Sequence, residues 1–139
     1  MEETIFSKII NREIPADIVY EDNDVLAFLD INPVSRGHTL VVPKKWSRNV
    51  LDIDSESWGK VMEVVRIIAP AIKKSMGADG LNIIMNVESA GNQAVFHSHI
   101  HIFPSFDNKK TVNWPEGTPY ALGESEKVAE KIRNTITKK

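Results

Sequence analysis

Cysteine is absent from the 139-residue sequence, which excludes disulfides, thiolate catalysis and cysteine-ligated zinc sites. The chain also lacks any run of about 18 apolar residues, and its first residues are acidic, so we expect neither a membrane span nor a signal peptide. Seventeen basic residues stand against 19 acidic ones without forming a basic stripe, which argues against broad nucleic-acid binding. We therefore expect a soluble, cytoplasmic protein with no nucleic-acid or membrane partner.

The residues that are present suffice for a hydrophobic core without covalent support. Hydrophobic residues make up 42% of the chain. A domain of this length buries roughly two-thirds of the surface that its unfolded chain exposes. Repeats and low-complexity segments are missing as well, so we expect one domain over residues 1–139.

The apolar pattern predicts a mixed fold. Short apolar runs separated by polar turns predict five strands, at 18–20, 25–29, 38–42, 81–87 and 95–104. Apolar residues spaced three and four apart predict helices at 5–11, 57–76 and 123–136. Asp54 or Ser55 would cap the long helix, and Gly77 would end it. A hairpin followed by a helix and adjacent strands indicates an α+β fold with an antiparallel sheet.

Three of the four histidines lie at every second position of the stretch 95–104, as His97, His99 and His101. Side chains alternate faces along a strand, so these three would share one face, with about 7 Å between successive ones. The alternate residues would face the core, and three of these four are large and apolar: Phe96, Ser98, Ile100 and Ile102. Imidazole can act as a neutral nucleophile, a general base or a cation near neutral pH, which makes this face the candidate site.

Three interpretations of these histidines compete. They can be ordinary satisfied or exposed side chains, since histidine is usually only partly buried. They can form a metal site, but a flat strand separates His97 from His101 by about 13 Å, too far for one ion with bonds of about 2 Å. They can perform nucleophilic catalysis at phosphorus, where one ring attacks while its neighbours fix its tautomer and donate protons. Three histidines in alternation favour the last interpretation.

The stretch resembles the signature of the histidine triad (HIT) family of nucleotide hydrolases and transferases, His-φ-His-φ-His-φ-φ with φ apolar. Here it stands at 97–103, with Ser98 as a polar departure at the first φ. The segments 5–16, 20–33 and 37–44 are similar to the family's opening and middle, so the resemblance covers nearly the whole chain. It implies a HIT-like fold, with roughly five antiparallel strands, one long helix and shorter terminal helices.

The resemblance also implies a role for each histidine. His99 would attack the α-phosphorus and form a transient nucleotidyl-histidine that water resolves. His97 would hold His99 in orientation, and His101 would donate a proton to the phosphate or the leaving group. His38 would support the triad from the neighbouring strand. No cofactor is implied.

The remaining site residues follow from the same resemblance. Asp30 would accept hydrogen bonds from the two ribose hydroxyls, although an aspartate at this point also suits a turn. Asn86 and Gln93 would offer amide donors, assisted by backbone N–H groups around 92–94. The base would enter an apolar slot formed by Phe6, Phe28, Ile31 and Leu40.

Several positions depart from the family pattern. Glu88 replaces a glycine of the Asn-x-Gly turn, and Asn92 replaces the glycine of a Gly-Gln pair. Ala94 replaces a serine or threonine that assists the leaving group. The ligands of a structural zinc found in some relatives are replaced as well, by Thr4, Ser7 and Trp46, so we predict no metal.

We predict a nucleotide-binding hydrolase or nucleotidyl transferase acting on the α-phosphate of purine nucleotide conjugates. Adenosine phosphoramidates, adenylated compounds and dinucleoside polyphosphates are the candidate substrates. The family resemblance implies a symmetric homodimer. Two alternatives stay open: a nucleotide-binding regulatory module with little or no catalytic activity, motivated by Glu88, Asn92 and Ala94, and a metal-dependent protein.

Overall fold

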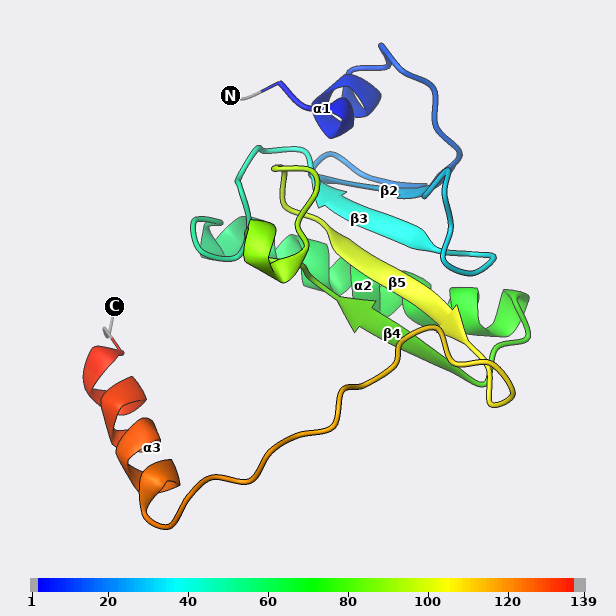
Figure 1. The fold of residues 1–139 in the computed structure, drawn as a ribbon. Helices are drawn as coiled ribbons and strands as arrows, with labels where there is room; N and C mark the ends of the chain where they lie inside the picture. Colours follow the sequence, from blue (N-terminus) through cyan, green and yellow to red (C-terminus); the bar gives the residue numbers. More distant parts are fainter. Residues whose placement is uncertain (1–2, 137–139) are drawn as a thin grey trace.

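The computed structural model of the protein describes residues 3–136 and contains one sheet and three α-helices (Figure 1). The strands are β1 (Ile18–Glu21), β2 (Val25–Leu29), β3 (Thr39–Pro43), β4 (Gly80–Ile84) and β5 (Ile100–Ser105). The helices are α1 (Ile5–Ile10), α2 (Ser55–Ser75) and α3 (Glu124–Thr135), with a 3₁₀ turn at Ser89–Gly91. These elements confirm the predicted α+β class.

All neighbouring strands pair antiparallel, in the order β1-β2-β3-β5-β4. The β1–β2 turn forms because one carboxylate oxygen of Asp22 accepts the N–H groups of Asp24 and Val25, each at 2.8 Å. β3 lies at the centre of the sheet and pairs with β5 through Leu40 and His101. This pairing brings residues 38–43 alongside the histidine stretch.

Two apolar clusters cover the two faces of the sheet. Asp54, one of the two predicted caps, is the N-cap of α2, and the helix packs on one face, where Val65 and Ile68 join Val41 and Ile102 in one cluster. α1 covers part of the opposite face, and Figure 1 shows it lying over the β2 and β3 end of the sheet. The second cluster therefore joins α1 to these strands, through Phe6, Ile9, Leu26, Phe28, Leu40 and Val42. Within residues 3–136, no helix combines the length and apolarity needed to cross a membrane.

The histidine strand is shorter than predicted. β5 begins at Ile100, so His97 and His99 precede it and only His101 lies on it. The backbone of the preceding stretch bonds to a loop instead of a strand, because Ser98 N–H donates to the carbonyl of Ser47 at 2.8 Å. The prediction of one continuous strand over 95–104 is therefore wrong, as is the even spacing of three rings along it.

β4 also ends earlier than predicted, at Ile84 instead of residue 87. Glu88 and Asn92 adopt positive φ angles of 66° and 69° around the 3₁₀ turn. A strand cannot continue through such angles. The segment between β4 and β5 contributes Asn86, Asn92 and Ala94 to the lining of the site.

Candidate active site

A pocket of about 440 Å³ lies between α1 and the sheet. Its surface is mainly apolar, as expected of a small-molecule site with a few convergent polar groups. Most of the predicted site residues line it: Phe6, Phe28, Asp30, Ile31, Leu40, Asn86, Asn92, Ala94, His99 and His101. Sequence analysis missed other lining residues, namely Ile5, Ile9, Ile14, Pro15, Ala16, Leu29, Asn32 and Val95. The helical spacing of Ile5 and Ile9 beside Phe6 is the signal that could have indicated the first two.

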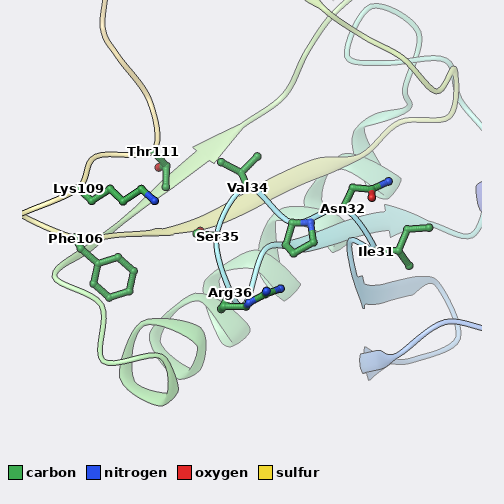
Figure 2. Close-up of a pocket in the computed structure, with 9 residues that line it drawn as sticks. Ile31, Asn32, Val34, Ser35, Arg36, Phe106, Lys109 and Thr111 are labelled. Atoms are coloured by element: carbon green, nitrogen blue, oxygen red, sulfur yellow. The ribbon is translucent and has the colours of Figure 1, made fainter.

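Figure 2 shows a second and larger depression, of about 630 Å³, between the loop 31–36 and the chain that follows β5. Arg36 and Lys109 are its charged residues, and none of the histidines lines it. It shares Ile31 and Asn32 with the histidine pocket. We place the candidate active site in the smaller pocket because the titratable groups converge there.

His99 is held so that one of its ring nitrogens can act as a nucleophile. Its Nδ1 lies 2.7 Å from the carbonyl oxygen of His97. A carbonyl only accepts, so Nδ1 carries the proton and Nε2 keeps its lone pair. The ring is 6% exposed and stands edge-on to Phe6 at 4.9 Å. Burial lowers the pKa of His99, which favours the neutral ring that nucleophilic attack requires.

The proton of His101 lies on the opposite ring nitrogen from that of His99, because of a hydrogen bond from His38. The Val34 N–H donates to His38 Nδ1 at 3.1 Å, so the proton of His38 sits on Nε2. That Nε2–H then donates to His101 Nδ1 at 3.0 Å. The remaining nitrogen of His101, Nε2, therefore carries a proton. Its ring centroid lies 4.9 Å from that of His99, much closer than a flat strand would allow.

The pKa of His101 is lowered to about 4, first by burial and then by the neighbouring His99 and His38. Burial likewise lowers the pKa of His38. Neutral rings are therefore the resting state of the site near pH 7. One neutral ring supplies a lone pair and another a donor N–H, which is the combination that nucleophilic substitution at phosphorus uses.

His97 lies behind the pocket. It is 0% exposed, and its Nε2–H donates to the carbonyl of Pro43 at 2.8 Å. The residue was expected to hold His99 in orientation, and its backbone carbonyl is the group that accepts the Nδ1–H bond of His99. Among the described residues, His97 Nδ1 is the buried side-chain polar atom that lacks a hydrogen-bond partner.

The loop after β3 fixes the histidine stretch. Trp46 Nε1–H donates to the carbonyl of Phe96 at 2.9 Å. The hydroxyls of Ser47 and Ser98 lie 2.6 Å apart, and both side chains are buried. This pair explains the serine at a usually apolar position: a hydroxyl there bonds the loop that holds His97 and His99 in place.

The side chain of Asp30 stabilises a turn and also lines the pocket. Its Oδ1 accepts the N–H of Asn32 at 2.8 Å. Its Oδ2 lies 3.7 Å from His38 Nε2. The carboxylate therefore reaches the pocket beside His101 with acceptor capacity beyond its turn bond, since an ionised carboxylate has about four lone-pair sites.

Gln93 does not line the pocket, contrary to expectation. Its amide N–H groups donate to the carbonyls of Arg48 and Val95. Its amide oxygen accepts from Asn49 and from the backbone of Glu88. With both of its N–H groups engaged, Gln93 stabilises the 88–93 turn from behind, and the side-chain amides at the pocket wall are those of Asn32, Asn86 and Asn92.

Comparison with known proteins places these observations in a family. The HIT domain model matches residues 11–108. The chain belongs to the HIT family. An uncharacterized HIT-like protein of Borreliella burgdorferi is 44% identical over 78% of this chain and 79% of its own length. The purine nucleoside phosphoramidase of Escherichia coli K12 is 43% identical over 73% of this chain and 86% of its own.

Solved structures agree with this assignment. The crystal structure of a HIT family member from Bacillus subtilis superimposes with a TM-score of 0.91 at 35% identity, covering 99% of this chain and 100% of that one. The HIT resemblance and the HIT-like fold inferred from the sequence are therefore confirmed.

The structural zinc of some HIT proteins does not fit the donors in this chain. Thr4 and Ser7 bond each other in a reciprocal capping box at the start of α1, and Trp46 is a donor only. Two hydroxyls and an indole N–H cannot replace the thiolate and imidazole ligands that zinc prefers.

A second group of possible metal ligands lies in the pocket itself. Asp30, His38 and His101 bring ligand atoms within 4.8 Å of one another. The Val34 N–H on His38 Nδ1, however, keeps the proton of that ring on Nε2, the atom that would have to bind the ion. The hydrogen bonds thus suit proton donation through His101 better than coordination of a metal.

Proposed function

We propose that this HIT protein is a nucleotide-binding hydrolase or nucleotidyl transferase acting on the α-phosphate of purine nucleotide conjugates. Candidate substrates are adenosine phosphoramidates, adenylated compounds and dinucleoside polyphosphates. One observation carries the proposal: His99 Nε2 keeps a lone pair while His101 Nε2, on the adjacent ring of the same pocket, carries a proton. The similarity to the E. coli purine nucleoside phosphoramidase supports it.

In the first step, His99 Nε2 attacks the α-phosphorus. A P–N bond forms and the bond from phosphorus to the leaving group breaks, while the Nε2–H of the neutral His101 ring donates a hydrogen bond to the departing atom, which takes its proton from water. The carbonyl of His97 stabilises the positive charge that develops on the His99 ring, through the Nδ1–H bond. Water then attacks the phosphorus of the nucleotidyl-histidine, the P–N bond breaks, His99 is regenerated, and the nucleoside monophosphate is released with the water's proton passing to solvent.

Different residues of the pocket would bind different parts of the substrate. Asp30 would accept from the ribose hydroxyls, and the base would lie against Phe6, Phe28 and Leu40. Asn86 and Asn92 would donate to ribose or phosphate. Ala94 lacks a hydroxyl for the leaving group, so His101 is the donor on which departure depends. We further propose that the protein is a cytoplasmic homodimer.

A substrate panel tests this function. The purified protein is incubated with adenosine phosphoramidate, an acyl-adenylate, diadenosine polyphosphates and the guanosine equivalents, and released mononucleotide is quantified. Intact-mass spectrometry of the same samples should detect an added nucleotidyl group. Asp30→Ala is the matched binding variant, for which affinity for AMP should fall more than turnover. No product and no adduct with any member of the panel would overturn the proposal.

The Glu88, Asn92 and Ala94 positions favour one second candidate, a nucleotide-binding regulatory module with little catalytic activity. Glu88 adopts a φ of 66° where a glycine would be unstrained, and it is held there by an ion pair with Arg48. Asn92 and Ala94 both line the pocket. Binding of AMP in calorimetry without turnover of any panel member would select this candidate.

A further inference from the structure

The depression between the loop 31–36 and the chain after β5 adjoins the histidine pocket and carries charge of one sign. Its volume of about 630 Å³ lies within the range of small-molecule sites. Nine described residues line it, Arg36 and Lys109 among them, and none of the nine is acidic. Figure 2 shows the two cations on different segments, Arg36 on the loop and Lys109 on the chain after β5. A hollow whose charged groups are all cations attracts anions and raises their local concentration.

Neither cation is neutralised by a neighbouring carboxylate. Within residues 3–136, Arg36 and Lys109 take part in no ion pair and no side-chain hydrogen bond. Arg36 also borders a smaller hollow that Asp17 and Asp30 line, but its guanidinium forms an ion pair with neither carboxylate. The N–H donors of both side chains are therefore available to a ligand.

The segments that carry the two cations are held by hydrogen bonds. The Ser35 hydroxyl donates to the carbonyl of Pro104 on β5 at 2.8 Å, and the His38 N–H donates to the carbonyl of Ser35 at 3.0 Å. On the other wall, the Lys109 N–H donates to the carbonyl of Phe106 at 3.1 Å and closes a short turn. An anion that binds between these walls therefore has little backbone left to order, which favours binding.

The depression lies at the end of the histidine pocket from which the leaving group departs. The two hollows adjoin, because Ile31 and Asn32 line both. Attacking and leaving atoms stand in line on opposite sides of the phosphorus. A group displaced by His99 therefore departs past His101, the ring that donates to it. From His101, β5 leads to the chain that lines the depression.

The available donors suit phosphate. A guanidinium binds two phosphate oxygens with its planar fork, and an ammonium group binds phosphate as a point charge. The side-chain amide of Asn32, which has no partner among the described residues, adds N–H donors at the shared wall. An amine leaving group carries no anionic oxygen for these donors, whereas a leaving group with further phosphates carries several.

We propose that Arg36, Lys109 and Asn32 form a second binding site, which holds the phosphates of an anionic leaving group. The site favours substrates in which the α-phosphate is linked to further phosphates over substrates in which it is linked to an amine. The inference rests on the proposed function, because that function supplies a leaving group at the α-phosphorus.

Steady-state kinetics with diadenosine tetraphosphate and adenosine phosphoramidate test the second site. In Arg36→Ala/Lys109→Ala, KM for the tetraphosphate should rise roughly tenfold, because the attraction of the two cations is lost. KM for the phosphoramidate should stay the same, and the charge-conserving Arg36→Lys/Lys109→Arg should retain most of the preference. Lys127→Ala/Lys131→Ala is the matched control, since it removes the same charge from α3, whose residues line neither hollow. No rise in KM, or an equal rise for both substrates, would overturn the second site.

A binding measurement makes the test independent of turnover. Calorimetry with His99→Ala compares diadenosine tetraphosphate with AMP. The tetraphosphate should bind more tightly, and this advantage should shrink as salt screens the exposed cations. Adding Arg36→Ala/Lys109→Ala should abolish the advantage without weakening AMP.

The outcomes separate the second site from the proposed function. Weaker AMP binding in the triple variant would assign the cations to the phosphate of the nucleotide itself and overturn the second site, as would equal affinities for the two ligands in His99→Ala. If the wild type turns over no substrate but the advantage is present and is lost with the two cations, the hydrolytic function fails and the second site stands.

Discussion

His99 and His101 stand two residues apart, but their Nδ1 atoms have opposite partners. His99 precedes β5 and donates from Nδ1 to the carbonyl of His97. His101 lies on β5 and accepts at Nδ1 from His38. The far nitrogen of the first ring therefore holds a lone pair and that of the second a proton. Two identical side chains obtain different chemistry because each has a different neighbour on one nitrogen.

The two neighbours also differ in kind. A backbone carbonyl that fixes His99 cannot be removed by substitution of a side chain. The partner of His101 is itself a side chain, fixed in turn by the N–H of Val34. The assignment of nucleophile and proton donor can thus be tested from the His101 side without disturbing His99.

The largest effect is expected from His99→Ala, which removes the atom that would bond phosphorus. Turnover should fall by at least about a thousandfold, as is typical when a nucleophile is deleted. Binding of AMP should stay measurable by calorimetry, because Asp30 and the apolar walls remain. Unchanged turnover would end the assignment of His99 as nucleophile and leave His101 as the ring to examine.

A smaller effect is expected from His38→Phe. Without the Nε2–H donor, His101 can place its proton on either nitrogen, so we expect kcat to fall roughly tenfold to a hundredfold with little change in KM. His38→Gln, whose amide can donate to His101 Nδ1, is the control and should retain more activity. Equal kcat values in the two variants would show that the His38 hydrogen bond does not direct His101.

Ser98→Val should affect stability more than chemistry. The substitution leaves the buried hydroxyl of Ser47 without its partner, at a cost of about 1–3 kcal/mol in the free energy of unfolding. Urea denaturation measures the loss, and adding Ser47→Ala should recover part of it, since both polar groups are then gone. An additive loss in the double variant would show that the two hydroxyls act independently.

The mildest effect is expected from pH. The folded pKa of His101 is about 4, below the ordinary value near 6.5, so the unfolded chain binds this proton first as the pH falls. The stability that His101 contributes is complete above about pH 6.5 and is lost progressively toward pH 4. The free energy of unfolding, measured by urea denaturation, should therefore decrease less between pH 7 and pH 4.5 for His101→Gln than for the wild type. Parallel curves for the two proteins would contradict the lowered pKa.

Much of this site could be predicted because the signals are local. The hairpin follows from the Asp22 turn between two apolar runs, and α2 from Asp54 and its apolar spacing. The histidine pattern at 97–101 predicted where the site lies, and Asp30 and Phe28 line the pocket found there. Gln93 was misplaced because the partners that engage its amide, Arg48 and Asn49, lie far away in the sequence.

The sequence by itself determined the fold class, the positions of its turns and caps, and which residue types could perform the chemistry, since these depend on neighbours along the chain. Only the tertiary structure decided where β5 begins and which nitrogen of each ring keeps its proton. Ser47, Pro43 and His38 set those features from other segments.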